Sequence, residues 1–361
     1  MKFAVFNVPF ALDYAAGRET LQEVIDWDLQ ATVWADEYGL DEVFFAEHYT
    51  LGAEPSPAPD LMIAAAARIT TRVKLGALGH LLPYHHPVAL AHRMMYLDHL
   101  TGGRYIAGVA PGAYPSDAQL FDTGKSNPAM MLEALDIIDS VFTKPGPWRV
   151  DGKFWTVDMP AYDDAIHGPH LRPLQDGGPE RIMTGMQPTS PTLTAAGERG
   201  YHPVSQLVGA HVLRQHWATY ATAAEGAGYT PSRADWRIVR DWLVADTDEE
   251  ARELALNGSL GRIFGSHNLP TFQQLGIASL LGDPGMDPSE VTTEWLIDNF
   301  CLVGSPETVA TKIRDFYDEV GGFGTLINAQ HNRNGNPEVW RRSWELTGKV
   351  VAPMLADLTG K

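Results

Sequence analysis

His48 is the residue whose neighbours place it best to do chemistry. It follows Glu47 directly after the apolar run Phe44 to Ala46, where a buried strand is expected to end. An imidazole titrates near neutral pH and can act as a general acid or base. A structural histidine hydrogen-bonded to its own loop would occupy the same position, so the position alone leaves both interpretations open.

Five more histidines lie close together in the chain, at His80, His85, His86, His92 and His99. Their spacing matches no zinc pattern, and no carboxylate stands among them in a ligand-like frame. His92 and His99 are one heptad apart on a predicted helix. We therefore expect no metal site.

Hydroxyl side chains gather in the segment that begins at Met186, where another strand leads into a helix. Thr189, Ser190 and Thr192 surround Pro191, which takes the expected first helical position. Hydroxyl and N–H groups at a helix start can bind an anion without basic side chains. An ordinary helix N-cap has the same composition.

Two glycines flank the end of a further predicted strand. Gly108 and Gly112 lie on either side of Ala110 and Pro111. Because glycine has no Cβ, the backbone there can approach a ligand closely.

The elements that must position these residues alternate regularly between strand and helix. Strands are expected at residues 3–8, 42–46, 73–78, 105–109, 181–185, 203–206, 237–244 and 323–328. Helices are expected at residues 20–38, 58–69, 87–100, 128–142, 190–199 and 210–226, from the N-cap Ser305, and at 337–355. This order predicts an α/β protein with a (β/α)8 TIM barrel. An open doubly wound sheet would need a glycine-rich turn after the first strand, and the sequence has none there.

Two insertions interrupt the alternation, at about residues 145–180 and 247–303, within a single domain of residues 1–361. The first contains Asp151-Gly152 between alternating aromatic flanks, which predicts a hairpin, followed by an irregular stretch from Tyr162 to Pro179. The second is the longest and lies between the seventh strand and its helix. It reads as helical from Asp248 to about Phe300.

The composition excludes several classes of partner and activity. With 45 acidic and 27 basic residues and a net charge of −18, the chain should repel nucleic acid and anionic lipid. No apolar run approaches the roughly 18 residues of a membrane span. The single cysteine, Cys301, fits a reducing cytoplasm. The motifs of common hydrolases and kinases are absent, which leaves those activities without support.

A long run of the sequence resembles the bacterial luciferase-like flavin-dependent monooxygenases. It reads FFAEHYTLGAEPSPAPDLMIAAAARITTRVKLGALGHLLPYHHPVALAHRMMYLDHLTGGRYIAGVAPGAYPSD. The likeness extends from Phe3 to about Leu355. The segments HLLPYHHP, GAYP, TGMQPTSP and LVGSP make the chain especially similar to the limonene 1,2-monooxygenases and the diketocamphane monooxygenases.

The resemblance assigns roles to several positions. His48 matches the family histidine beside the reactive edge of the flavin, where it serves as base and hydrogen-bond partner. Leu78-Gly79 matches a strand-end bulge that often holds a non-prolyl cis peptide behind the flavin. Ala110 takes the place of a reactive cysteine, so thiol chemistry there is not expected. Cofactor contacts are expected from Leu78, Gly79, Ala110, Gly112, Met186, Thr189, Ser190 and Thr192, the last three at the phosphate.

Two positions depart from the luciferases themselves. Tyr49 stands where they carry a second histidine, and Pro111 stands where they carry an arginine near the phosphate. These departures argue against light emission and require other donors for the phosphate.

The resemblance also implies a reaction. Reduced FMN, supplied by a separate NAD(P)H:flavin reductase, would activate O2 to oxygenate a small apolar substrate, such as a terpenoid-like cyclic ketone or alkene. The second insertion would act as a lid that keeps water out. A deazaflavin-dependent oxidoreductase on the same fold and a non-catalytic flavin-binding protein remain as alternatives. A homodimer is expected, as is common for the family and for proteins generally.

Overall fold

A closed parallel barrel forms the centre of the molecule. The computed structural model describes residues 1–163, 165–166, 171–329, 331–333 and 336–360. Its barrel strands are β1 (Lys2–Asn7), β2 (Glu42–Phe45), β3 (Lys74–Ala77), β5 (Tyr105–Ala110), β8 (Glu180–Gly185), β9 (His202–Ser205), β10 (Arg237–Val239) and β13 (Thr325–Asn328). Each strand pairs in parallel with its neighbours, and β3 pairs with β5, β10 with β13 and β13 with β1, so that the ring closes. The predicted (β/α)8 barrel is confirmed.

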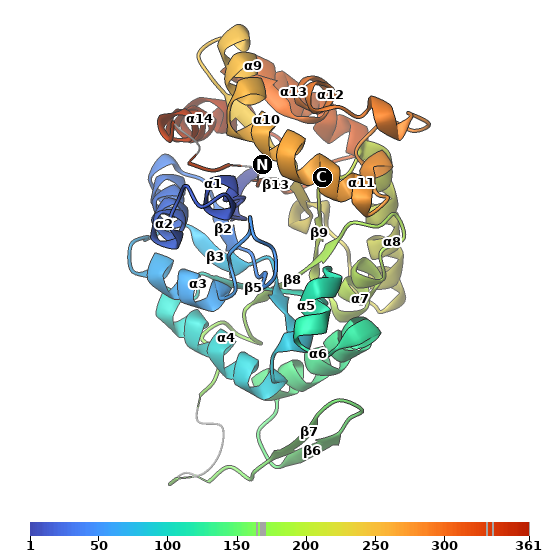
Figure 1. Cartoon of the computed structure of the whole chain (residues 1–361). Coiled ribbons are helices and arrows are strands. Elements are labelled where there is room, and N and C mark those ends of the chain that lie inside the picture. Colours follow the sequence, from blue (N-terminus) through green and yellow to red (C-terminus); the bar gives the residue numbers. More distant parts are fainter. Residues whose placement is uncertain (164, 167–170, 330, 334–335, 361) are drawn as a thin grey trace.

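Helices surround the strands on the outside (Figure 1). The main ones are α2 (Leu21–Tyr38), α3 (Pro59–Ala67), α4 (Pro87–Thr101), α6 (Asn127–Thr143), α7 (Pro191–Arg199), α8 (Ala210–Gly226), α13 (Pro306–Val320) and α14 (Glu338–Leu346). Their ends follow local signals in the sequence. Helix α2, for example, begins with a capping box between Thr20 and Glu23 and ends at Gly39 in the left-handed conformation.

The predicted strand 237–244 is wrong in its second half. The chain leaves the barrel after β10, and Trp242–Val244 forms β11, which pairs with β12 (Leu302–Gly304) in a separate two-stranded sheet. Tertiary hydrogen bonds cause the break, because the Asp241 carboxylate accepts the Ala329 N–H at 2.7 Å and its carbonyl accepts the Leu302 N–H at 2.9 Å. Strand β12 was not expected.

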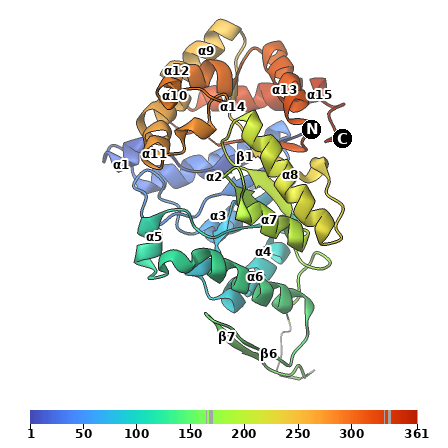
Figure 2. The same ribbon diagram turned by 90° about the vertical axis from the view of Figure 1, so that its right-hand side faces the viewer.

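The first insertion projects from the body of the molecule as a hairpin (Figure 2). Strands β6 (Trp148–Asp151) and β7 (Thr156–Met159) pair antiparallel, as predicted. The turn is longer than the Asp151-Gly152 pair alone, since four residues separate the strands. The Glu133 carboxylate of α6 fixes the turn by accepting backbone N–H groups of residues 153–155. Part of the irregular stretch 162–179 lies outside the described residues.

The second insertion is helical, as predicted. It contains α9 (Asp248–Asn257), α10 (Ser259–Ile263), the π-helical turn η4 (Phe264–Asn268), α11 (Leu269–Gln274), α12 (Thr293–Trp295) and the π-helical turn η7 (Leu296–Phe300), with short 3₁₀ turns between them. Helix α10 passes beside α1 (Leu12–Ala15), a short helix that follows β1 (Figure 1). Among the described residues, no helix has the length and apolar character that a membrane span requires.

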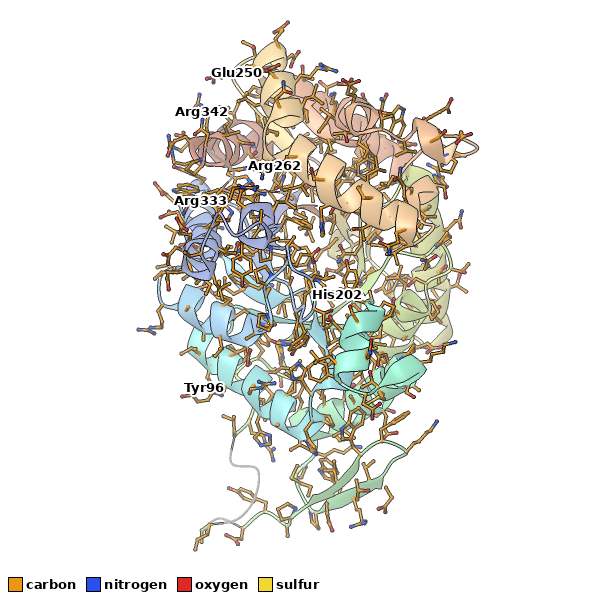
Figure 3. The ribbon with its side chains drawn as sticks, in the orientation of Figure 1. Tyr96, His202, Glu250, Arg262, Arg333 and Arg342 are labelled. Carbon is orange, nitrogen blue, oxygen red and sulfur yellow. The ribbon has the colours of Figure 1, made fainter. Side chains whose placement is uncertain are left out.

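A network of charged groups closes the barrel at the amino-terminal ends of its strands. Arg237, 2% exposed, donates to both carboxylate oxygens of Glu42 at 2.7 and 2.8 Å and to Glu180 at 2.6 Å. Glu180 also pairs with Lys74 at 3.0 Å and with His202 at 2.9 Å (His202 is labelled in Figure 3). Each of these five residues is the first of its strand. This end of a TIM barrel serves stability, and the opposite end carries the chemistry.

Candidate active site

The carboxyl end of β3 carries the first expected site feature. The peptide bond between Leu78 and Gly79 is cis, as the resemblance implied. Beyond it, β4 (His80–Leu81) continues the sheet by pairing with the end of β5, so that Leu81 lies opposite Ala110. A Cβ on Gly79 would lie 2.7 Å from the Val109 nitrogen, so the two strand ends are in close backbone contact. Leu78, Gly79 and Ala110 therefore meet at one edge of the barrel.

His48 lies at the end of β2 and is held from one side. Its Nε2 is 3.2 Å from Oε2 of Glu54, a carboxylate that is 3% exposed. Its Nδ1 is buried and has no hydrogen-bond partner among the described residues. The Tyr114 ring packs edge-on at 5.4 Å. The Glu54 carboxylate therefore stands beside Nε2 of His48 at ion-pair distance.

Glu47 points away from His48 and gathers the neighbouring histidines. Nε2 of His85 lies 2.7 Å from its Oε1, and Nδ1 of His80 lies 3.7 Å from its Oε2. Arg93 donates to Nδ1 of His85 at 2.9 Å, which leaves Nε2 as the donor to Glu47. Burial would raise the pKa of Glu47, but the interactions with His85 and His80 outweigh it and hold the pKa well below its usual range.

Tyr49 joins the same group. Its hydroxyl donates to Glu47 at 2.6 Å, and its ring packs on Phe121 at 4.7 Å. Burial, reinforced by the charge of Glu47, raises the pKa of Tyr49. The Tyr49 hydroxyl therefore stays protonated and adds a hydrogen bond to the Glu47 carboxylate. No cluster of three or more potential metal ligands occurs within the described part of the chain.

The loop after β8 holds the hydroxyl residues in a defined order. Thr192 donates to the Thr184 carbonyl at 2.5 Å, and Ser190 and Thr192 hydroxyls are 2.7 Å apart. Ser190 also accepts the Leu193 N–H as the N-cap of α7. The hydroxyl protons of Ser190 and Thr192 are thus used within the protein, whereas Thr189 is exposed.

A buried histidine that the sequence did not single out fixes this loop. Nε2 of His216 on α8 donates to the Gln187 carbonyl at 2.7 Å, and its Nδ1 accepts from Ser205 at 3.0 Å. Trp236 in turn donates to Ser205 at 3.0 Å. Burial lowers the pKa of His216, which favours this neutral tautomer.

Gly112 allows a tight turn after β5. Its φ of 83° lies in the left-handed region, and a Cβ there would lie 2.7 Å from the Tyr84 hydroxyl. Asn127 donates to that hydroxyl at 3.0 Å, and Phe121 stacks on the Tyr84 ring at 4.5 Å. Ala110 and Met186 are half-buried at the ends of the adjacent strands β5 and β8.

Three polar residues near these sites were not singled out from the sequence: Glu54, His216 and His267. His267 lies on η4 of the second insertion, and its Nε2 is 2.7 Å from Oε1 of Glu54. His216 and His267 belong to no recognisable motif, and the contact between Glu54 and His267 joins distant parts of the chain. The Glu-Pro-Ser-Pro loop after His48 was the one available indication that this segment is constrained.

The family model described as luciferase-like monooxygenase matches residues 1–322. The chain belongs to the luciferase-like monooxygenase family. As a member of this family it is a flavin-dependent monooxygenase.

Individual relatives align with most of this chain and with most of their own length. The 3,6-diketocamphane 1,6-monooxygenase of Pseudomonas putida is 35% identical over 95% of this chain and 96% of its own. The limonene 1,2-monooxygenase of Rhodococcus erythropolis is 31% identical over 91% and 81%. A solved structure of the oxygenating constituent of Pseudomonas putida 3,6-diketocamphane monooxygenase, a type II Baeyer-Villiger monooxygenase in complex with FMN, superposes with a TM-score of 0.91. That structure is 33% identical and covers 98% of each chain.

Proposed function

We propose that this protein uses FMN, reduced by a separate NAD(P)H:flavin reductase, to insert one oxygen atom of O2 into a small apolar cyclic ketone or alkene. The observation that carries the proposal is His48, which pairs at Nε2 with a buried carboxylate at the barrel edge where Leu78, Gly79 and Ala110 meet. The likeness to an FMN-bound Baeyer-Villiger monooxygenase supports the same cofactor.

The residues present fit a flavin mononucleotide. Leu78, Ala110 and Met186 offer an apolar surface for the ring, and Gly79 and Gly112 give backbone without side chains beside it. The start of α7, with the exposed Thr189, would bind the phosphate. The cofactor, once reduced and bound, supplies the electrons that activate O2.

His48 would act on protons in this reaction. Its imidazole can accept a proton as oxygen transfer begins and return it when the product forms. Residues of the second insertion would exclude water from the site.

An anaerobic titration tests the cofactor. The protein is titrated with FMN and with a deazaflavin, each oxidised and reduced, and binding is followed by absorbance and fluorescence. We expect reduced FMN to bind. Binding of the deazaflavin alone would replace oxygen transfer by hydride transfer and overturn the proposal.

A second experiment tests turnover and the reductase. Reduced FMN, air and a panel of cyclic terpenoid ketones and alkenes are combined with the protein, and products are identified by mass spectrometry. We expect oxygenated product from at least one substrate, and NADH oxidation only after a flavin reductase is added. Oxygen uptake without product on every substrate would favour a flavin-binding protein. Rapid NADH oxidation by the pure protein would contradict the proposal that a separate reductase supplies the reduced FMN.

We also propose a homodimer. Large apolar side chains are exposed around α3 and α4, namely Leu61 (69%), Ile69 (47%) and Tyr96 (66%), and Tyr96 is labelled in Figure 3. Such a surface is typical of protein contacts. Light scattering at increasing protein concentration should give twice the 39.6 kDa chain mass, and Tyr96→Glu should shift the value toward the single chain.

A further inference from the structure

One buried carboxylate joins two histidines that come from distant parts of the chain. Oε2 of Glu54 lies 3.2 Å from Nε2 of His48, and Oε1 lies 2.7 Å from Nε2 of His267. The Glu54 side chain is 4% exposed, and those of His48 and His267 are 19% and 18% exposed. Each oxygen of Glu54 therefore has one imidazole partner in a site that is largely closed to water.

The backbone of Glu54 is fixed. Its N–H donates to the Leu51 carbonyl at 3.0 Å, and its carbonyl accepts the Ser56 N–H at 2.8 Å. The preceding residue, Ala53, accepts the Ala11 N–H at 2.6 Å. The carboxylate thus stands on a loop anchored at several points, and the two histidines are oriented toward it.

His267 belongs to the second insertion. It lies on η4, and π-helical turns of this kind are often found at functional sites. Its ring packs edge-on against Phe10 at 5.6 Å. One turn earlier, Arg262 donates to both oxygens of Asp13 at 2.7 and 3.1 Å. This pair joins α10 to α1, and Arg262 is labelled in Figure 3.

These contacts connect the seating of the insertion to the state of His48. A carboxylate oxygen only accepts hydrogen bonds, so His267 donates from Nε2 to Oε1, while Nε2 of His48 lies 3.2 Å from Oε2. When η4 is seated, His267 holds Oε1 and directs Oε2 at His48. Without His267 against it, Oε1 would lose this partner and the carboxylate would be free to turn away from His48.

We propose that Glu54 is a positioning residue that couples closure of the second insertion, through His267, to the orientation and tautomer of His48. The benefit of this coupling to oxygen transfer rests on the proposed function. Only the closed site would hold His48 with its lone pair on Nδ1. Glu54 itself does not touch the reacting atoms. Glu54 would thus orient His48 to accept a proton at the time when the insertion excludes water.

The test uses two variants and a control on the full-length protein. Glu54→Gln offers one acceptor and one donor where two acceptors are needed. His267→Phe keeps a ring against Phe10 but cannot donate to Glu54. Ser266→Ala changes an exposed residue of the same π-helical turn and should behave as the parent protein. Circular dichroism and thermal melting establish that each variant folds.

Histidine nitrogen NMR gives a readout that needs neither flavin nor substrate. In the parent protein we expect His48 to be protonated at Nε2 and unprotonated at Nδ1. In His267→Phe the His48 signals should shift toward a mixture of tautomers, although His267 does not contact His48. Unchanged His48 signals in folded His267→Phe and Glu54→Gln would overturn the coupling.

Activity gives the second readout. We expect oxygenation kcat to fall about 10- to 100-fold in both variants, by analogy with metal-binding histidines that lose the partner that orients them. Affinity for reduced FMN should be unchanged, and a larger share of O2 should appear as hydrogen peroxide. If the parent protein makes no product but the NMR coupling is present, the proposed function fails and the coupling stands. Normal kcat and normal peroxide yield in both folded variants would contradict the coupling.

Discussion

His48 is the side chain on which the proposed chemistry depends, and a matched pair of variants isolates it. His48→Gln keeps a donor for Glu54 but removes the basic ring nitrogen. We expect product formation to fall about 10²- to 10⁴-fold, the range for a lost general acid–base group. Affinity for reduced FMN should stay the same. The control is His86→Gln, because His86 is exposed at the start of α4 and its side chain caps no backbone group.

Single-turnover experiments with reduced FMN separate the two effects, because binding and product yield are measured independently. Equal product yield from His48→Gln and His86→Gln would show that His48 does not take part in the reaction. Loss of flavin binding in His48→Gln would instead make it a cofactor-holding residue.

Asp28 is a buried acid with no function in the proposed reaction, and it should make stability depend on pH. Burial, and after it the charge of Glu19, raises the pKa of Asp28 to about 8. Its Oδ1 is buried without a partner among the described residues. In the unfolded chain the pKa returns to about 3.9. Between these values the folded protein holds a proton that the unfolded chain has lost.

The stabilising contribution is therefore complete below about pH 4 and is lost as the pH rises toward 8. The loss is about 1.4 kcal/mol per pH unit between pH 5 and 7. Asp28→Asn removes this titration. As the pH rises, the free energy of unfolding of the variant should therefore increase relative to that of the parent protein by about 1.4 kcal/mol per pH unit. Urea denaturation at several pH values measures both proteins. Parallel pH profiles would show that Asp28 is ionised in the folded state.

At the scale of elements, the contact between β3 and β5 depends on a missing side chain. A Cβ on Gly108 would lie 1.9 Å from the Ala77 carbonyl oxygen of β3. Gly108→Ala should therefore separate the strands where the barrel closes and cost about 1–3 kcal/mol, as overpacked cores do. Gly226→Ala is the control, since a Cβ at the end of α8 would have no atom of the described residues within 4 Å. Its melting temperature should be unchanged or slightly higher. Equal melting temperatures for both variants would mean that the two strands can move apart without cost.

The elements also show what the sequence could predict and what it could not. Short-range signals act between neighbours, so the N-cap at Ser305 and the hairpin at Asp151-Gly152 were predicted correctly. The end of β10 depends instead on Asp241 binding Ala329, a contact across 88 positions, and the apolar pattern continued through it. The link from Glu54 to His267 spans 213 positions and has no local pattern at either end. His48 was predicted because its own strand end marks it, whereas the residues that orient it are visible only after folding.

At the scale of the whole molecule, the two ends of the barrel separate stability from chemistry. The charged network around Arg237 lies at the amino-terminal ends of the strands, and the site around His48 lies at the carboxyl ends. Arg237→Leu would leave Glu42 and Glu180 buried without their shared cation. Removing one partner of a buried ion pair costs about 3–5 kcal/mol.

We therefore expect Arg237→Leu to lower the melting temperature sharply while kcat per folded molecule, measured well below the transition, stays at the parent value. Arg149→Ala is the control, because Arg149 pairs with Asp151 and Asp158 on the exposed hairpin and the screened pairs there should add no measurable stability. A kcat that falls together with stability in Arg237→Leu would show that the strand ends bearing His48 move with the opposite end of the barrel. An unchanged melting temperature would show that Glu42 and Glu180 find other partners or take up protons, and that closure of this barrel does not depend on its buried arginine.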